Sequence, residues 1–113
     1  MTWRVRTATA ADEDFDVIVL WTEAAFSAAQ AEEYAARLSA AIAELCEGPA
    51  SLRAKPIKGP HPNLVTVRVA RRRRKSSHLF LCQVRKDEKL ILVLRILHER
   101  MDVRRHIPDR IED

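Results

Sequence analysis

Hydrophobic and polar residues alternate in four short segments, which is the pattern of β-strands with one face toward the core. These segments are residues 2–6, 64–70, 78–84 and 89–97. The first places Trp3 and Val5 on one face and two arginines on the other. The last opens with the apolar run LILVL at residues 90–94, which fits a strand buried on both faces.

A period of three to four residues predicts two amphipathic helices after the first strand, at about residues 10–26 and 28–47. Capping-box patterns beginning at Thr9 and Ser27 mark their starts, and Gly48-Pro49 ends the second helix. The first apolar stripe, with Trp21 at its margin, consists of Phe15, Ile18, Val19, Thr22, Ala25 and Phe26; the second consists of Ala31, Tyr34, Ala35, Leu38, Ile42 and Leu45. Because almost no connector separates these helices, they are expected to fold back as an αα-hairpin.

Short connectors join the last three strands, so these strands are expected to be antiparallel neighbours, with a tight turn at residues 85–88. The predicted order is β-α-α-β-β-β, an α+β fold in which a twisted, mainly antiparallel sheet carries a helical hairpin on one face. Residues 48–63 hold four of the five prolines and are expected to form an irregular loop. The predicted core contains Phe15, Ile18, Leu38, Ile42, Val67, Leu81 and Val93.

With 113 residues and 47% hydrophobic side chains, the chain is expected to form a single domain over residues 1–113, with the tail from about residue 107 as a candidate flexible end. No apolar run reaches the roughly 18 residues of a membrane span, and no signal-peptide pattern is present. We therefore expect a cytoplasmic protein without a membrane partner. Cys46 and Cys82 are expected to be reduced thiols, with a disulfide as the alternative.

The net charge of +4 conceals two unlike halves of the chain. Residues 1–50 carry 3 basic and 9 acidic side chains, whereas residues 51–113 carry 17 basic and 7 acidic side chains. A half this basic predicts an anionic partner, either nucleic acid or a protein rich in Asp and Glu.

The densest basic run, RRRRK at residues 71–75, is predicted to occupy a hairpin tip. It could contact phosphates, receive an acidic protein, or only keep the loop solvated. The cations of the irregular loop, among them Lys58, could likewise contact an anion or could be ordinary solvated charges. The candidate anion- or target-binding residues are Arg53, Lys55, Arg71, Arg72, Arg73, Arg74, Arg85, Arg95 and Arg100.

Arg95 interrupts the apolar run of the last strand, where a guanidinium is costly unless it is paired or used. It either forms an ion pair, with Glu99 or Asp102, or serves as an anion clamp on the sheet. His98 and His106 follow, and each imidazole could be structural or could act as a general acid or base near neutral pH. Arg95, His98 and His106 are thus the catalytic candidates if the chain is a ribonuclease.

Metal and cofactor sites are not expected. The four histidines and two cysteines are scattered without a ligand pair at useful spacing. Two glycines are too few for a phosphate-cradling loop. The sequence therefore predicts neither a bound metal nor a cofactor.

The C-terminal part of the chain carries a family resemblance. The pattern V-L-R-I-L-H-x-R-x-D at residues 93–102, followed by R-H-I-P, resembles the last strand and tail of RelE/ParE-family toxins. Trp21-Thr22, Gln30-Ala31 with Tyr34, and Gly48-Pro49 extend the similarity over roughly residues 1–106. These toxins belong to bacterial type II toxin–antitoxin pairs, so the resemblance implies the same fold and a tight complex with an acidic antitoxin.

The two branches of this family imply different activities. RelE-type toxins are ribosome-dependent mRNA endoribonucleases, often assisted by a C-terminal aromatic or imidazole side chain. ParE-type toxins share the fold but inhibit DNA gyrase by binding. The only tyrosine, Tyr34, belongs to the second predicted helix, so no tyrosine is available in the tail. The resemblance therefore favours a gyrase inhibitor, with the endoribonuclease as the alternative and a housekeeping nucleic-acid binder as a third reading.

Overall fold

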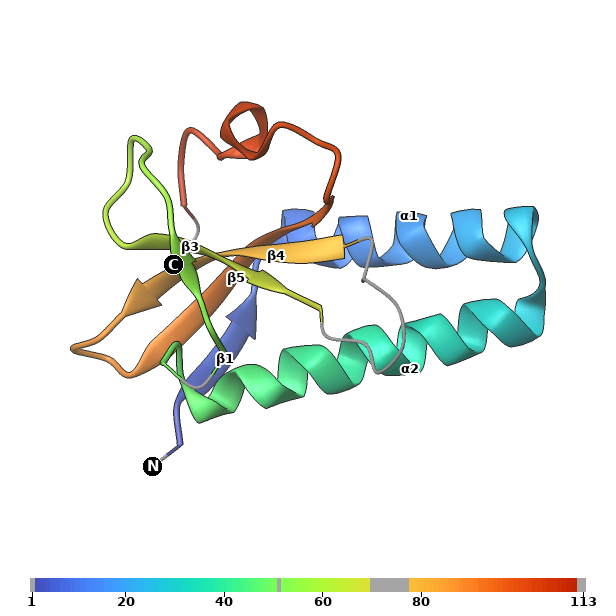
Figure 1. The fold of residues 1–113 in the computed structure, drawn as a ribbon, viewed down its shortest axis with the longest axis horizontal. Coiled ribbons are helices and arrows are strands. Elements are labelled where there is room, and N and C mark those ends of the chain that lie inside the picture. Colours follow the sequence, from blue (N-terminus) through green and yellow to red (C-terminus); the bar gives the residue numbers. More distant parts are fainter. Residues whose placement is uncertain (1, 51, 70–77, 112–113) are drawn as a thin grey trace.

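The computed structural model describes residues 2–50, 52–69 and 78–111, and its fold is the predicted α+β arrangement (Figure 1). The elements are β1 (Arg4–Thr7), α1 (Thr9–Ala25), α2 (Ala28–Glu44), the 3₁₀ turn η1 (Leu45–Glu47), β2 (Lys55–Pro56), β3 (Leu64–Arg68), β4 (His78–Arg85), β5 (Leu90–His98) and the 3₁₀ turn η2 (Val103–His106). The sheet order is β1-β5-β4-β3-β2. β1 is parallel to β5, and every other pair is antiparallel. The two-residue edge strand β2 lies within the predicted irregular loop and was not expected.

The two helices begin in different ways. The Ser27 hydroxyl accepts a hydrogen bond from the backbone N–H of Gln30 at 3.1 Å, as the capping box of α2 predicts. The predicted Thr9 cap is wrong, because the N-cap of α1 is Ala8, without a side-chain cap, and Thr9 is the first helical residue. The Thr7 hydroxyl donates instead to the Asp12 carboxylate at 2.8 Å, which ties the end of β1 to the first helical turn.

The sheet is apolar on both faces. The helix side carries a cluster that includes Val67, Phe80, Cys82, Val93 and the helix residue Leu38. The predicted core residues Leu38, Val67, Leu81 and Val93 are buried, whereas Phe15, Ile18 and Ile42 are partly buried against the helix-side cluster. Leu81 belongs to the opposite face, so the sheet has two cores and not one.

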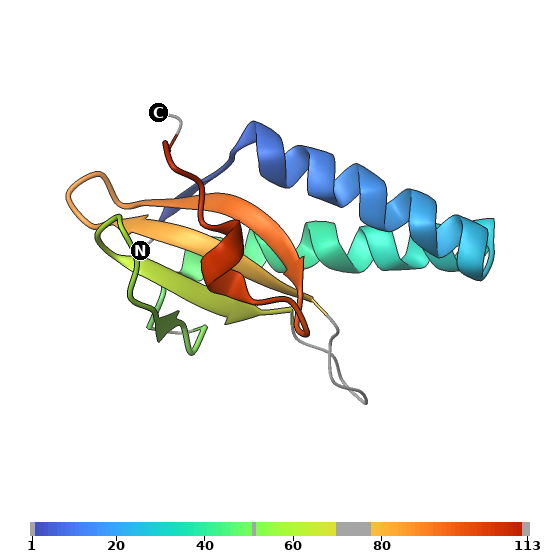
Figure 2. The same ribbon diagram turned by 90° about the horizontal axis from the view of Figure 1, so that it is seen from above.

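The buried apolar cluster on the face opposite the helices consists of six leucines, namely Leu64, Leu79, Leu81, Leu92, Leu94 and Leu97. Ile57, Val103, Ile107 and Ile111 pack against it, so the C-terminal segment crosses this face as a cover (Figure 2). The His61 imidazole donates from Nε2 to the Pro108 carbonyl at 2.7 Å and fastens the segment to the loop before β3. Both faces of the central strands are thereby removed from water.

A β-bulge separates the two halves of β5. Leu81 is opposite Arg95 and Cys82 is opposite Val93, so Leu94 has no cross-strand partner. A bulge inserts one residue and shifts the side-chain alternation beyond it. Val93 therefore faces the helices and Leu94 faces away, while Ile96 faces the helices again. The bulge therefore lies directly before Arg95, and beyond it Ile96 takes the position on the helix side that Arg95 would have in a regular strand.

Arg95 pairs with Asp14 of α1, and not with either predicted carboxylate, Glu99 or Asp102. Its Nε and Nη2 donate to the two Asp14 oxygens at 2.7 and 2.9 Å. The same carboxylate accepts the backbone N–H of Ile96 at 2.9 Å. These hydrogen bonds raise the pKa of Arg95 above its usual value, because Asp14 stabilises the charged guanidinium. Of the two roles left open for Arg95, the structure therefore has the ion pair.

The helical hairpin is longer than the part of the sheet that it covers. Each 17-residue helix spans about 26 Å at 1.5 Å per residue, and the connected ends extend past the strand ends in both views (Figures 1 and 2). Val17, Leu20, Trp21 and Phe26 of this overhang are each 63–64% exposed. Placing Phe26 in the core-facing stripe was therefore wrong, because no strand lies beneath it.

The two cysteines are free thiols, as the sequence predicts. Cys82 is completely buried on the helix side of the sheet, and burial raises the pKa of its thiol to about 12. Cys46 is half-buried at the end of α2. Cys82 is therefore a core side chain that stays protonated at neutral pH.

The contact between Asp14 and Arg95 should contribute strongly to stability. Asp14→Asn leaves a partly buried guanidinium without its counter-charge, and we expect a loss of about 2 kcal/mol, since hydrogen bonds to charged groups are worth about 1.5–3 kcal/mol. Urea unfolding followed by circular dichroism measures the change. The matched control is Glu33→Gln, which removes an exposed ion pair with Arg37 on α2 and should cost at most about 0.5 kcal/mol. Equal midpoints for both variants would contradict this role.

Candidate functional site

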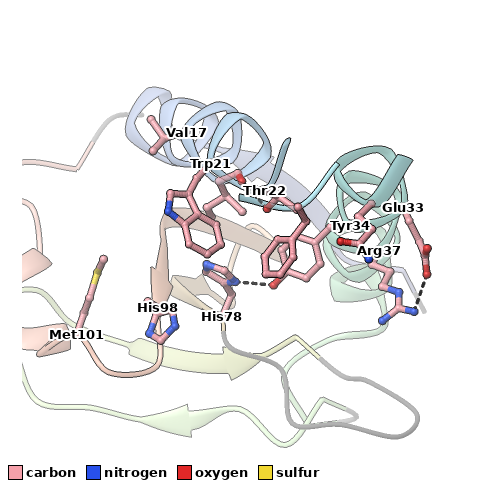
Figure 3. Close-up of a pocket in the computed structure, with 12 residues that line it drawn as sticks. Val17, Trp21, Thr22, Glu33, Tyr34, Arg37, His78, His98 and Met101 are labelled. Atoms are coloured by element: carbon pink, nitrogen blue, oxygen red, sulfur yellow. Dashed lines mark hydrogen bonds and ion pairs between the residues drawn. The ribbon is translucent and has the colours of Figure 1, made fainter. Parts of the chain in front are cut away.

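An open groove lies where the helical hairpin leaves the sheet. It encloses about 700 Å³ between α1, α2 and the adjoining ends of β4 and β5 (Figure 3). Its lining residues are Val17, Ile18, Trp21, Thr22, Phe26, Gln30, Glu33, Tyr34, Arg37, His78, His98 and Met101. The lining thus combines an apolar wall from α1 with a group of polar rings at the strand ends.

Three rings meet at the floor of the groove. His78 begins β4 and His98 ends β5, and the antiparallel register places them directly opposite each other. Their ring centroids are 5.5 Å apart at 81°, an edge-to-face arrangement. The Tyr34 hydroxyl of α2 is hydrogen-bonded to His78 Nδ1 at 2.5 Å. One helix and two strands therefore bring a phenol and two imidazoles together, and the described carboxylates do not enter this ring cluster.

The end of β5 is fixed by His98 itself. Its Nδ1 accepts the backbone N–H of Arg100 at 3.1 Å, and its backbone carbonyl accepts the N–H of Met101 at 2.9 Å. These two bonds form the tight turn that follows the strand. Met101 is 46% exposed and its side chain closes one side of the groove (Figure 3).

The opposite wall consists of exposed aromatic rings. Trp21 and Phe26 pack edge to face with their centroids 5.8 Å apart. Each is 63% exposed, although a soluble protein usually covers such side chains. Together with Val17 and Met101 they make up the apolar part of the lining, which is typical of a surface that binds another protein.

The sequence predicted only one member of the ring cluster, His98. His106 lies on η2 and does not line the groove, so the two predicted catalytic histidines are not brought together. Arg95 is held by Asp14. Tyr34 and His78 were missed because 44 residues separate them in the chain, and only the packing of α2 over the strand ends joins them.

The predicted cations do not form one site among the described residues. Arg53 and Lys55 lie at and beside the edge strand β2. Arg85 is at the far end of β4 from His78, about 23 Å away at roughly 3.3 Å per residue, and donates to the Gln83 side chain. Arg100 is exposed next to His98. Arg71, Arg72, Arg73 and Arg74 lie outside the described residues.

Residues 2–50, 52–69 and 78–111 contain no group of three or more His, Cys, Asp or Glu side chains that could hold a metal ion. In the same ranges, no helix is long and apolar enough to cross a membrane. The groove and its rings are thus the chemically distinctive surface of the part of the chain that the structure describes.

Solved structures with the same architecture come from toxin–antitoxin systems. One is the chromosomal ParDE system from P. aeruginosa, with a TM-score of 0.65 and 16% identity over 85% of this chain and 95% of that chain. Another is the RelBE2 toxin–antitoxin complex from Mycobacterium tuberculosis, with a TM-score of 0.57 and 17% identity over 88% of this chain and 93% of that chain. The fold is therefore that of the ParE and RelE toxins.

Sequence comparison assigns the branch. Residues 5–103 match the family model described as the ParE toxin of the type II toxin–antitoxin system, parDE. The Toxin ParE of Escherichia coli is 30% identical over 102 residues, covering 90% of both chains. The chain belongs to the ParE toxin family of type II toxin–antitoxin systems.

Proposed function

We propose that this chain inhibits growth by binding DNA gyrase and that a cognate acidic antitoxin holds it inactive in the cytoplasm. The family assignment supports the toxin class. The single observation that carries the binding role is the open apolar groove beside the strand ends. In this account the whole chain acts as one binding domain, without a metal or a cofactor.

The groove is the surface on which we expect the antitoxin to dock. Its wall is the continuation of a helix stripe past the end of the sheet, and the described part of the chain leaves Trp21 and Phe26 largely exposed. Large aromatic anchors of this kind supply most of the affinity in protein interfaces. The basic half of the chain, with 17 basic and 7 acidic residues, favours association with an acidic partner.

DNA gyrase, and not mRNA, is the preferred target because the predicted catalytic residues of a ribonuclease, Arg95, His98 and His106, do not lie together. Arg95 would have to stabilise charge on a phosphate, but its Nε–Nη2 edge already binds Asp14, which restricts its freedom to reach another anion. His106 lies on η2, outside the groove that contains His98. An inhibitor that acts by binding needs neither arrangement.

One observation favours the endoribonuclease as a second candidate. Tyr34 was set aside because it lies far from the tail in sequence, yet it reaches His78, which is paired with His98. A phenol and two imidazoles are groups that can transfer protons near neutral pH. The second candidate therefore rests on Tyr34, His78 and His98, and no longer on His106.

Antitoxin binding should depend on the apolar wall of the groove. Trp21→Ala should weaken the complex about 30-fold, because truncating an aromatic anchor costs about 2 kcal/mol or more. Calorimetry with the cognate antitoxin measures the change. The complex should also persist at about 0.5 M salt, where exposed charges are strongly screened.

Leu20→Ala is the matched control for this experiment. Leu20 lies on the same helix and is 63% exposed like Trp21, but it does not line the groove. Its truncation should leave the affinity nearly unchanged. Equal losses for both variants, or dissociation of the wild-type complex by salt alone, would contradict docking in the groove.

The target is tested by expressing the chain without its antitoxin. A gyrase inhibitor should induce the DNA-damage response and filamentation while translation continues at first. Purified gyrase should accumulate cleaved plasmid in the presence of the chain. Rapid arrest of translation with cleaved messages, lost in Tyr34→Phe combined with His98→Ala, would instead make the chain a ribonuclease.

A further inference from the structure

His98 connects the groove to the turn that shapes it. Its Nδ1 accepts the backbone N–H of Arg100, and a ring nitrogen can accept only when it carries no hydrogen. The neutral ring therefore carries its hydrogen on Nε2. The turn that positions Met101 against the groove thus depends on an unprotonated Nδ1.

Protonation of His98 has to occur at this same nitrogen. Nδ1 then becomes a donor that faces the N–H donor of Arg100, and the hydrogen bond is lost. His78 responds differently, because its Nδ1 is bonded to the Tyr34 hydroxyl, which can either donate or accept. Protonation at His78 preserves that bond, because the protonated Nδ1 donates and the hydroxyl accepts. Of the two paired imidazoles, His98 is the one whose charge disrupts the backbone.

The described charges around His98 offer little compensation. Glu99, directly after β5, pairs with Arg68 of β3 at 2.7 Å. Across the groove, Glu33 of α2 pairs with Arg37 at 3.0 Å, and α1 contributes an apolar wall. The remaining ionisable neighbours are His78 of β4, Tyr34 of α2 and the exposed Arg100. A proton on His98 would therefore place a charge between a second imidazole and an apolar groove.

We propose that His98 makes docking in the groove pH-sensitive, so that acidification loosens the 98–101 turn and weakens binding of the apolar antitoxin segment. This inference rests on the proposed function, since it assigns a regulation to the same docking surface. Imidazole is the side chain whose charge normally changes between about pH 5 and pH 8. A modest fall in pH would then shift the binding equilibrium between toxin and antitoxin toward free toxin.

The sign of the pH dependence distinguishes this occupant from another. An apolar segment binds more weakly when His98 is charged, because binding would remove water from that charge. A segment that places a carboxylate against the two imidazoles would bind more tightly at low pH. The lining by Val17, Trp21, Phe26 and Met101 favours the first case.

The switch itself is tested in the free chain by NMR. Between about pH 8 and pH 5.5, the amide resonances of Arg100 and Met101 should shift, and their protection against hydrogen exchange, relative to the intrinsic rate at each pH, should fall together with protonation of His98. In His98→Asn the side-chain oxygen replaces Nδ1 as the acceptor but cannot be protonated in this range, so both responses should disappear. Unchanged amides in the wild type would overturn the proposal.

The consequence for docking is tested with the cognate antitoxin. The dissociation constant should rise about tenfold from pH 8 to pH 5.5, the factor expected for one lost hydrogen bond and a desolvated charge. His98→Asn should remove this ratio whatever its affinity at pH 8, whereas His78→Asn and His106→Asn should retain it. A ratio that persists in His98→Asn, or tighter binding at low pH, overturns the inference. Failure to bind at pH 8 overturns the proposed function itself.

Discussion

The position of the helical hairpin depends on the contact between Asp14 and Arg95. The carboxylate accepts two hydrogen bonds from the guanidinium and a third from the backbone of Ile96. Hydrophobic packing alone would allow α1 to slide along the sheet, because apolar contacts have no direction. A charged, bidentate contact has one geometry, so it fixes the height of α1 above β5. The β-bulge at Leu94 lies directly before Arg95, and it brings Ile96, whose backbone N–H joins the contact, to the helix side of the strand.

This fixed position determines where the groove lies. Asp14 anchors the first half of α1 over the sheet, and the end of the helix that connects to α2 extends beyond the strands (Figure 1). The same placement carries α2 across the strand ends and brings Tyr34 to His78. The groove thus combines the unsupported end of a helix stripe with the terminal residues of two central strands. A protein whose function is to bind a partner can keep such a surface open because the partner covers it.

The sequence predicted the elements well because their signals are local. Alternation identified β3, β4 and β5, and the Ser27 capping box marked the start of α2 within a residue. The partner of Arg95 could not be found in this way, since the prediction searched nearby carboxylates while Asp14 lies 81 residues away. The bulge could not be predicted either, because every residue of the run at 90–94 is apolar. The sequence pattern is therefore the same whether or not the strand register shifts by one residue.

The candidate site was predicted less completely, for a physical reason. Phe26 was assigned to the core because helical periodicity records which residues share a face, not how far the sheet beneath that face extends. The ring cluster joins α2, β4 and β5, and only His98 stood out in a polar tail. Four of the predicted cations, Arg71, Arg72, Arg73 and Arg74, lie outside the described residues and stay predictions. The resemblance to toxins was more informative than any single residue, and the family match confirms it.

The central claim is that the antitoxin binds in the groove. Hydrogen–deuterium exchange of the chain, free and in the presence of the cognate antitoxin, tests this most directly. We expect protection on binding to concentrate in the second half of α1, around Tyr34 and in the turn at residues 98–101. Protection confined to the β2 edge or to the C-terminal cover of the leucine face, with the groove unchanged, would contradict it.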